Sequence, residues 1–132
     1  MSWPSIKISN EINPSEIDNM EYIENTYFMR DEPPTCIRKV LFPKNGEITK
    51  SIDEESSVVK IVTESEMHDF FEFIANFLTT CNLGFERFID DSEGSLFIHY
   101  NDGHIEEYDR GLTKNGISLL SIIRHYTQDN DI

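Results

Sequence analysis

Cysteine, basic residues and long apolar runs are all scarce in this chain. Its 132 residues include only Cys36 and Cys81, which lie far apart and form no CxxC pair. A small secreted domain held by disulfides has a denser set of cysteines, so we interpret these two as buried free thiols of a reducing compartment. No apolar stretch approaches the roughly 20 residues that cross a bilayer, and residues 1–4 do not begin a signal peptide. We therefore expect a cytoplasmic protein that does not enter a membrane.

The shortage of basic residues leaves a strong negative charge. Eleven Lys and Arg stand against 25 Asp and Glu, which gives a net charge of −14. Nucleic acids and anionic membranes are bound through positive surfaces, so direct binding to either is not expected. The acids are concentrated: residues 11–32 hold seven acids and one arginine, and residues 84–111 hold eight acids and two arginines, hence −6 in each. Such a concentration fits either a solvated surface or a surface that binds a partner.

Signatures of catalysis are missing from the sequence. There is no GxxxxGK[ST] or GxGxxG loop, no HExxH and no GxSxG elbow. His99 and His104 flank the turn at Asp102, and in a two-residue hairpin His99 would face Glu106, whereas a three-residue loop would shift this register. A His–carboxylate pair can act as an acid–base couple or as half of a metal site. Without a nucleophile or third ligand we interpret it as surface pairing, and we expect no enzymatic activity, metal or cofactor.

The apolar residues indicate one folded domain over residues 1–132, because 38% of the residues are hydrophobic and the length is typical of a domain. A short strand is predicted at 5–9, followed by a helix that Asn13 caps, that Pro14 begins and that ends before Pro33. Further strands are predicted at 36–42, 47–52, 58–62, 85–90, 95–100 and 104–109, helices at 65–80 and 115–127, and a frayed tail at 128–132. Hairpins dominate this order, which predicts an α+β fold, a mostly antiparallel sheet with helices packed on one face.

The last three predicted strands combine carboxylates with tyrosines that could be exposed. Clustered carboxylates complement a basic groove, and aromatic anchors contribute affinity. A basic groove is what a nuclease presents to phosphates. The candidate partner-binding residues are Glu86, Asp90, Asp91, Glu93, Tyr100, Asp102, Glu106, Glu107, Tyr108 and Asp109.

With its acidic, aromatic-bearing segment 85–109, its Asp102-Gly103 turn and its compact α+β layout, the chain resembles bacterial toxin-immunity proteins, including those of contact-dependent growth inhibition systems. The resemblance implies an inhibitor, monomeric or weakly dimeric, that binds a cognate basic toxin domain such as a nuclease. Two alternatives stay open. The order of predicted elements is similar to that of type III secretion chaperones, which are acidic dimers, and the same charge fits a phage nucleic-acid mimic that disables host defence.

Overall fold

The computed structural model describes residues 12–29, 31–79, 83–88 and 92–128. In chain order the elements are the 3-10 turn η1 (Pro14–Glu16), β1 (Ile17–Thr26), β2 (Cys36–Pro43), β3 (Glu47–Ile52), β4 (Glu55–Ile61), α1 (Glu64–Leu78), β5 (Gly84–Phe85), β6 (Ser92–Tyr100), β7 (Ile105–Asp109), β8 (Leu112–Lys114), β9 (Ile117–Ser118) and α2 (Leu119–Thr127). Strands β2, β3 and β4 lie where the sequence predicts, although β4 begins three residues earlier than expected.

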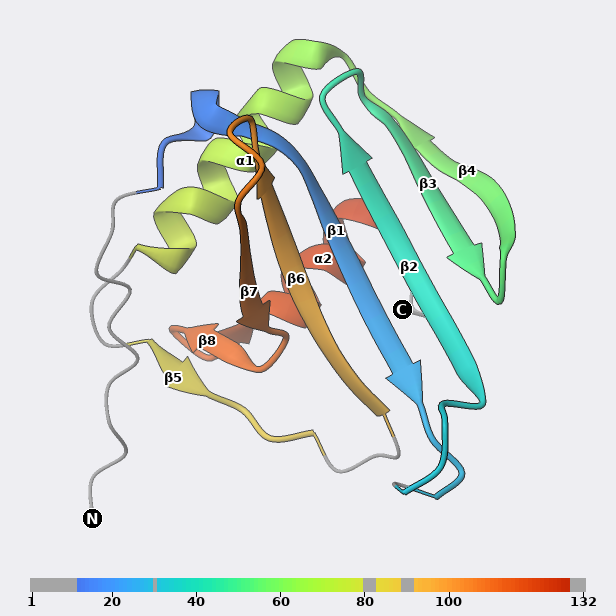
Figure 1. Ribbon diagram of the computed structural model, residues 1–132. Helices are drawn as coiled ribbons and strands as arrows, with labels where there is room; N and C mark the ends of the chain where they lie inside the picture. The colour runs from blue at the N-terminus through green and yellow to red at the C-terminus, as the bar shows by residue number, and fades with distance from the viewer. Residues whose placement is uncertain (1–11, 30, 80–82, 89–91, 129–132) are drawn as a thin grey trace.

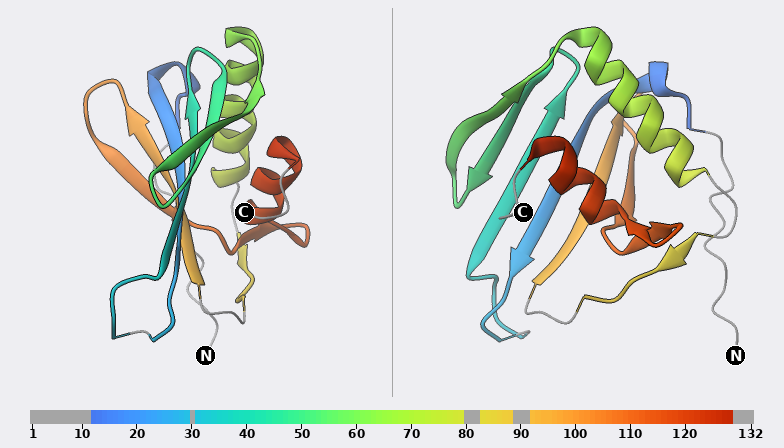
Figure 2. Two further views of the ribbon diagram at one scale, coloured as in Figure 1. Left: turned by 90° about the vertical axis from the view of Figure 1, so that its right-hand side faces the viewer. Right: turned by 180° about the vertical axis from the view of Figure 1, so that it is seen from behind.

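A six-stranded antiparallel sheet of order β4-β3-β2-β1-β6-β7 forms the main layer, and β5, β8 and β9 form a small second sheet. Both helices lie on the same face of the large sheet (Figures 1 and 2). The predicted α+β class, with helices packed on one face of an antiparallel sheet, is therefore confirmed. Within the described residues, neither helix is long and apolar enough to span a membrane.

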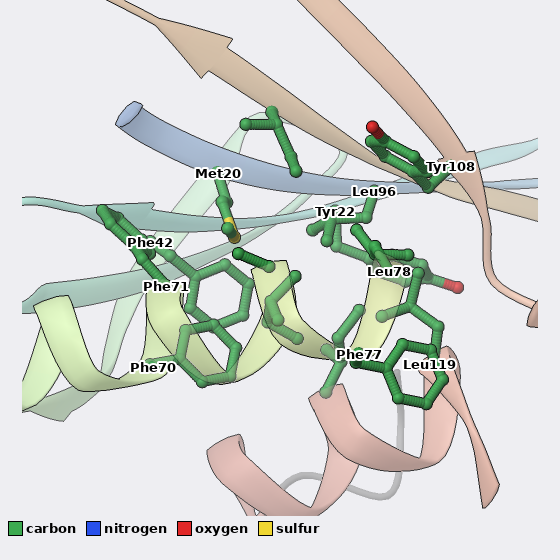
Figure 3. Packing of buried hydrophobic residues seen from close by; sticks show 14 of the residues in the cluster. Met20, Tyr22, Phe42, Phe70, Phe71, Phe77, Leu78, Leu96, Tyr108 and Leu119 are labelled. Carbon is green, nitrogen blue, oxygen red and sulfur yellow. The ribbon is translucent and has the colours of Figure 1, made fainter. Parts of the chain in front are cut away.

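Helix α1 lies close to its predicted bounds and supplies much of the core. Glu66 N donates to Thr63 Oγ1 and Thr63 N donates to Glu66 Oε1, each over 3.1 Å, so a capping box closes the first turn. One stripe of the helix is buried, formed by Met67, Phe70, Phe71, Ile74, Phe77 and Leu78. This stripe packs against the inward-pointing side chains of the sheet, which come from alternate residues and include Tyr22, Phe42 and Leu96 (Figure 3).

The predicted helix from Asn13 to Pro33 is wrong. Asn13 does cap a turn, since Ser15 N donates to its Oδ1 over 3.1 Å, and Pro14 does begin that turn. The turn ends at Glu16, however, and the long strand β1 follows it. Strand β1 pairs with β2 on one side and with β6 on the other, so pairing along its whole length outweighs the weak local preference for helix. The predicted strand at 5–9 lies outside the described residues.

The predicted meander of three C-terminal strands is also only partly right. Strand β6 pairs with β7 as expected, but its other neighbour is β1, and Gly84–Phe85 pairs with β8 in the small sheet. Helix α2 begins at Leu119 instead of 115, because Asn115 and Gly116 have φ of +54° and +79° and form the turn of a hairpin between β8 and β9. At the other end of α2, Gln128 is the left-handed cap, and residues 129–132 of the predicted tail lie outside the described residues.

Candidate functional site

Two acidic segments that are distant in the sequence lie side by side in the sheet. Strand β6 is the neighbour of both β1 and β7, so residues from 11–32 and from 84–111 share one surface. Strands β1, β6 and β7, here called the acidic half of the sheet, contain no Lys or Arg and seven carboxylates: Asp18, Glu21, Glu24, Glu93, Glu106, Glu107 and Asp109. Strands β2, β3 and β4 carry four bases and two acids: Arg38, Lys39, Lys50, Lys60, Glu47 and Glu55. The sheet is therefore polarised from one edge to the other.

Alternation along the strands divides the acidic half between two faces. Residues such as Met20, Leu96 and Ile98 point toward the helices and are fully buried. The residues between them point away from the helices, on the face that neither helix covers (Figure 2). This surface, here called the acidic face, includes Glu21, Ile23, Glu93, Ser95, Phe97, His99, Ile105, Glu107 and Asp109.

Three predicted partner-binding residues lie on the acidic face, and each accepts a hydrogen bond. Tyr27 Oη donates to Glu93 Oε1 over 2.7 Å, and Ser95 Oγ donates to Glu107 Oε2 over 3.0 Å. Asp109 Oδ1 accepts a bond of 2.7 Å from Gly111 N. These bonds restrict the carboxylates to few orientations, which lowers the conformational entropy that a partner would have to remove on binding.

Three other predicted residues lie on the opposite, helix-facing side at the edge of the sheet. Tyr100 and Tyr108 are buried, and both hydroxyl groups donate to Glu106 Oε1, the bond from Tyr108 being 3.2 Å long. Burial and the adjacent Glu106 carboxylate raise the pKa of both tyrosines. The structure thus brings these three residues together with one another and separates them from the acidic face.

The turn between β6 and β7 contains another predicted site residue, Asp102. His104 N donates to Asp102 Oδ1 over 2.9 Å, which lowers the pKa of that carboxyl, and His104 Nδ1 lies 2.6 Å from the same oxygen. Tyr100 N donates to His104 O around the three-residue loop 101–103, so His99 lies opposite Ile105 and not opposite Glu106. The His99–Glu106 pair of a two-residue hairpin is therefore wrong. Among the described residues no three His, Cys, Asp or Glu side chains are grouped to hold a metal.

The remaining predicted residues add little to the acidic face. Glu86 is exposed and follows β5, and its backbone N donates to Gly111 O over 2.7 Å. Asp90 and Asp91 lie outside the described residues. Sequence reasoning missed Glu21 and Phe97. The negative charge of residues 11–32 indicates Glu21, but the helix predicted for that segment places Glu21 outside the sheet.

A groove of about 1060 Å³ lies on the helix side of the molecule. The ring of Phe70 stacks on Tyr126 with centroids 4.0 Å apart, and Phe73 and Ile117 in the lining are more than half exposed. The groove also contains Lys60 and Glu66, and hence charges of both signs. Its chemistry differs from that of the acidic face.

No protein-family model, curated protein or solved structure matches this chain.

Proposed function

We propose that this protein is an immunity protein or inhibitor that binds a basic toxin domain through its acidic face. The observation that carries the proposal is the polarised sheet: β1, β6 and β7 hold seven carboxylates and no Lys or Arg, and neither helix covers their outer face. A nuclease domain presents positive charge to phosphates. A surface that presents fixed carboxylates in place of phosphates competes for that positive charge and blocks the substrate.

The mixture of charge and apolar area on the acidic face also supports this function. Phe97 is half-buried, Ile105 is 54% exposed, and both lie among carboxylates. Long-range attraction between the acids and a basic domain accelerates association. Aromatic and aliphatic side chains near the centre of an interface then supply much of the affinity. The acidic face therefore offers a partner both its carboxylates and the exposed side chain of Ile105.

Co-expression with the product of the adjacent gene, scored by growth, tests the proposal. The wild-type chain should relieve toxicity, and a variant with Glu21→Gln, Glu93→Gln, Glu107→Gln and Asp109→Asn should not. The matched control changes Glu47, Glu54, Glu55 and Glu72 to Gln, which are exposed acids elsewhere on the molecule. Either variant removes four of the 14 net negative charges and has a net charge of −10. Equal protection by the two variants, or no protection by the wild-type chain, would contradict the proposal.

The apolar groove favours one other candidate function, a secretion chaperone of the type III kind. Such a chaperone holds an unfolded apolar segment of its client, and a groove of about 1060 Å³ with exposed Phe73 and Ile117 is suited to that. This function also requires a dimer. A monomer in light scattering at the concentrations used for binding would eliminate it.

A further inference from the structure

A row of three residues crosses the acidic face at its centre. Phe97 of β6 lies directly opposite Glu21 of β1 and directly opposite Glu107 of β7. Side chains that are directly opposite in antiparallel strands have Cβ atoms about 4.5–5.5 Å apart and point to the same face. One aromatic ring therefore has a carboxylate on each side, on a surface that the helices do not cover (Figure 2).

In the part of the chain that the structure describes, neither carboxylate of this row forms an ion pair with a Lys or Arg. His99 Nε2 lies 3.9 Å from Glu21 Oε1, and Ser95 Oγ, a neutral group, donates to Glu107 Oε2. On the adjoining strand β2, the outward-facing Lys39 lies opposite Ile23, one row away from Phe97. By contrast, Glu24 on the inner face of β1 accepts a 2.8 Å hydrogen bond from Arg110. The inner carboxylate is neutralised within the fold, whereas the outer pair still lacks a strong cationic partner on its own three strands.

The ring and the two carboxylates of this row are suited to bind a guanidinium group. An aromatic ring attracts a cation over its face, and the planar guanidinium of arginine stacks there more readily than a strongly hydrated ammonium group. A carboxylate beside the ring can accept two parallel N–H bonds from the same group. We propose that Glu21, Phe97 and Glu107 bind an arginine side chain of the basic partner, with its guanidinium over the ring and its N–H groups directed to the two carboxylates. This inference rests on the proposed function, because the partner supplies the arginine.

Charge complementarity also argues against other occupants of this face. A second copy of the chain would place Glu21, Glu93, Glu107 and Asp109 against the same four acids, and like charges in an interface are costly. An apolar segment would have to desolvate those carboxylates without pairing them. A segment rich in arginine can stack a guanidinium group on the ring and pair its positive charges with the carboxylates.

Titration of the purified full chain with a short arginine homopeptide, followed by NMR, tests the inference. The Phe97 ring signals and the backbone amides of Glu21 and Glu107 should shift most. Phe97→Leu should weaken arginine-peptide binding roughly two- to fivefold, as expected for a cation–π contact with a partly exposed ring. A lysine homopeptide of the same length should be affected less. The matched control is Phe73→Leu, which removes an exposed ring from the groove on the helix side and should change neither affinity.

Several results would overturn the inference: strongest shifts elsewhere on the protein, an equal effect of Phe97→Leu on both peptides, or Phe97 signals that depend on protein concentration and so indicate self-association. These outcomes can be separated from a failure of the proposed function. If the four-acid variant protects cells as well as its control, the proposed function fails even when the arginine peptide contacts Phe97. If Phe97→Leu protects cells fully and binds the arginine peptide normally while the four-acid variant does not protect, only the arginine site fails.

Discussion

Arg110 Nη1 donates a 2.8 Å hydrogen bond to Glu24 Oε1, and each residue is only 4% exposed. Tyr22 Oη donates to the same carboxylate oxygen over 3.1 Å, and Arg110 Nη2 donates to Ser92 O over 3.0 Å. This buried network joins β1 and β6 to the turn that follows β7. It therefore holds together the three strands that carry the acidic face.

We expect Arg110→Met to destabilise the protein by about 3–5 kcal/mol, because it leaves the Glu24 carboxylate buried without its main cationic partner. Arg38 Nη1, 3.6 Å from Glu24 Oε2, should keep the loss toward the lower end of that range. Urea unfolding measures the change. The exposed Arg87→Met is the control and should change stability by less than about 0.5 kcal/mol. A loss below about 1 kcal/mol for Arg110→Met would show that Arg110 is not the main partner of Glu24.

The buried tyrosines predict a loss of stability at alkaline pH. Burial raises the pKa of Tyr22, Tyr100 and Tyr108 above the ordinary value of about 10. Between about pH 10 and the raised folded-state values, the unfolded chain has lost these phenolic protons while the folded protein retains them. Unfolding then releases protons, so the unfolding free energy should fall by about 1.4 kcal/mol per pH unit for each tyrosine. Below about pH 10 both the folded and the unfolded states keep these phenolic protons, so the full stabilisation is present and the unfolding free energy does not change with pH through these tyrosines.

Urea unfolding at a series of alkaline pH values, with tyrosinate absorbance recorded on the folded protein, measures this dependence. Tyr108→Phe should reduce the slope by the contribution of one tyrosine, about 1.4 kcal/mol per pH unit, while the other buried tyrosines keep theirs. Titration of all the tyrosines near pH 10 in the folded protein would contradict the expectation.

The sequence predicts helix α1 correctly and strand β1 incorrectly for the same physical reason. Helix α1 is specified locally: Thr63 and Glu66 form its capping box, and its apolar residues recur at helical spacing, so its stripe was visible without knowledge of the fold. Strand β1 begins after a genuine helical start signal at Asn13 and Pro14, and its buried set includes the charged Glu24. Only the pairing with the next strand, β2, and with β6, which is distant in sequence, makes β1 a strand. Local patterns contain no information about such partners.

The sequence predicts the candidate site only in part, and for the same reason. Glu93, Glu107 and Asp109 were selected because they belong to one acidic segment, and they do share a face. Tyr100 and Tyr108 were selected from the same segment but point inward, because alternation places them on the side of the core. The contribution of Glu21 needed the strand order, which no local feature of the sequence provides.

The turn at Gly46 should tolerate no side chain. Gly46 has a φ of +88°, its carbonyl accepts a 2.9 Å bond from Val62 N, and an added Cβ would overlap Val62 O. Gly103 has a similar φ of +94° but open space around the position of a Cβ, so Gly103→Ala is a control for backbone strain alone. We expect Gly103→Ala to cost about 1–2 kcal/mol and Gly46→Ala about 1–3 kcal/mol more, measured by thermal or urea unfolding. Equal losses would mean that the β2–β3 turn can move away from Val62.

The acids of the central row should contribute nothing to folding stability. Glu21 and Glu107 lie on either side of Phe97, on three strands that contain no Lys or Arg, so each adds to the negative potential that the other feels. The double variant Glu21→Gln, Glu107→Gln keeps similar volumes, and its amide at 107 can still accept from Ser95 Oγ. We expect its unfolding free energy to be equal to that of the wild type or higher by a few tenths of a kcal/mol, with a larger gain at low salt, where repulsion is less screened. Urea unfolding at two ionic strengths measures both effects. A destabilisation of more than about 1 kcal/mol would assign these carboxylates to the fold, whereas an unchanged or increased stability leaves binding as the property that their placement serves.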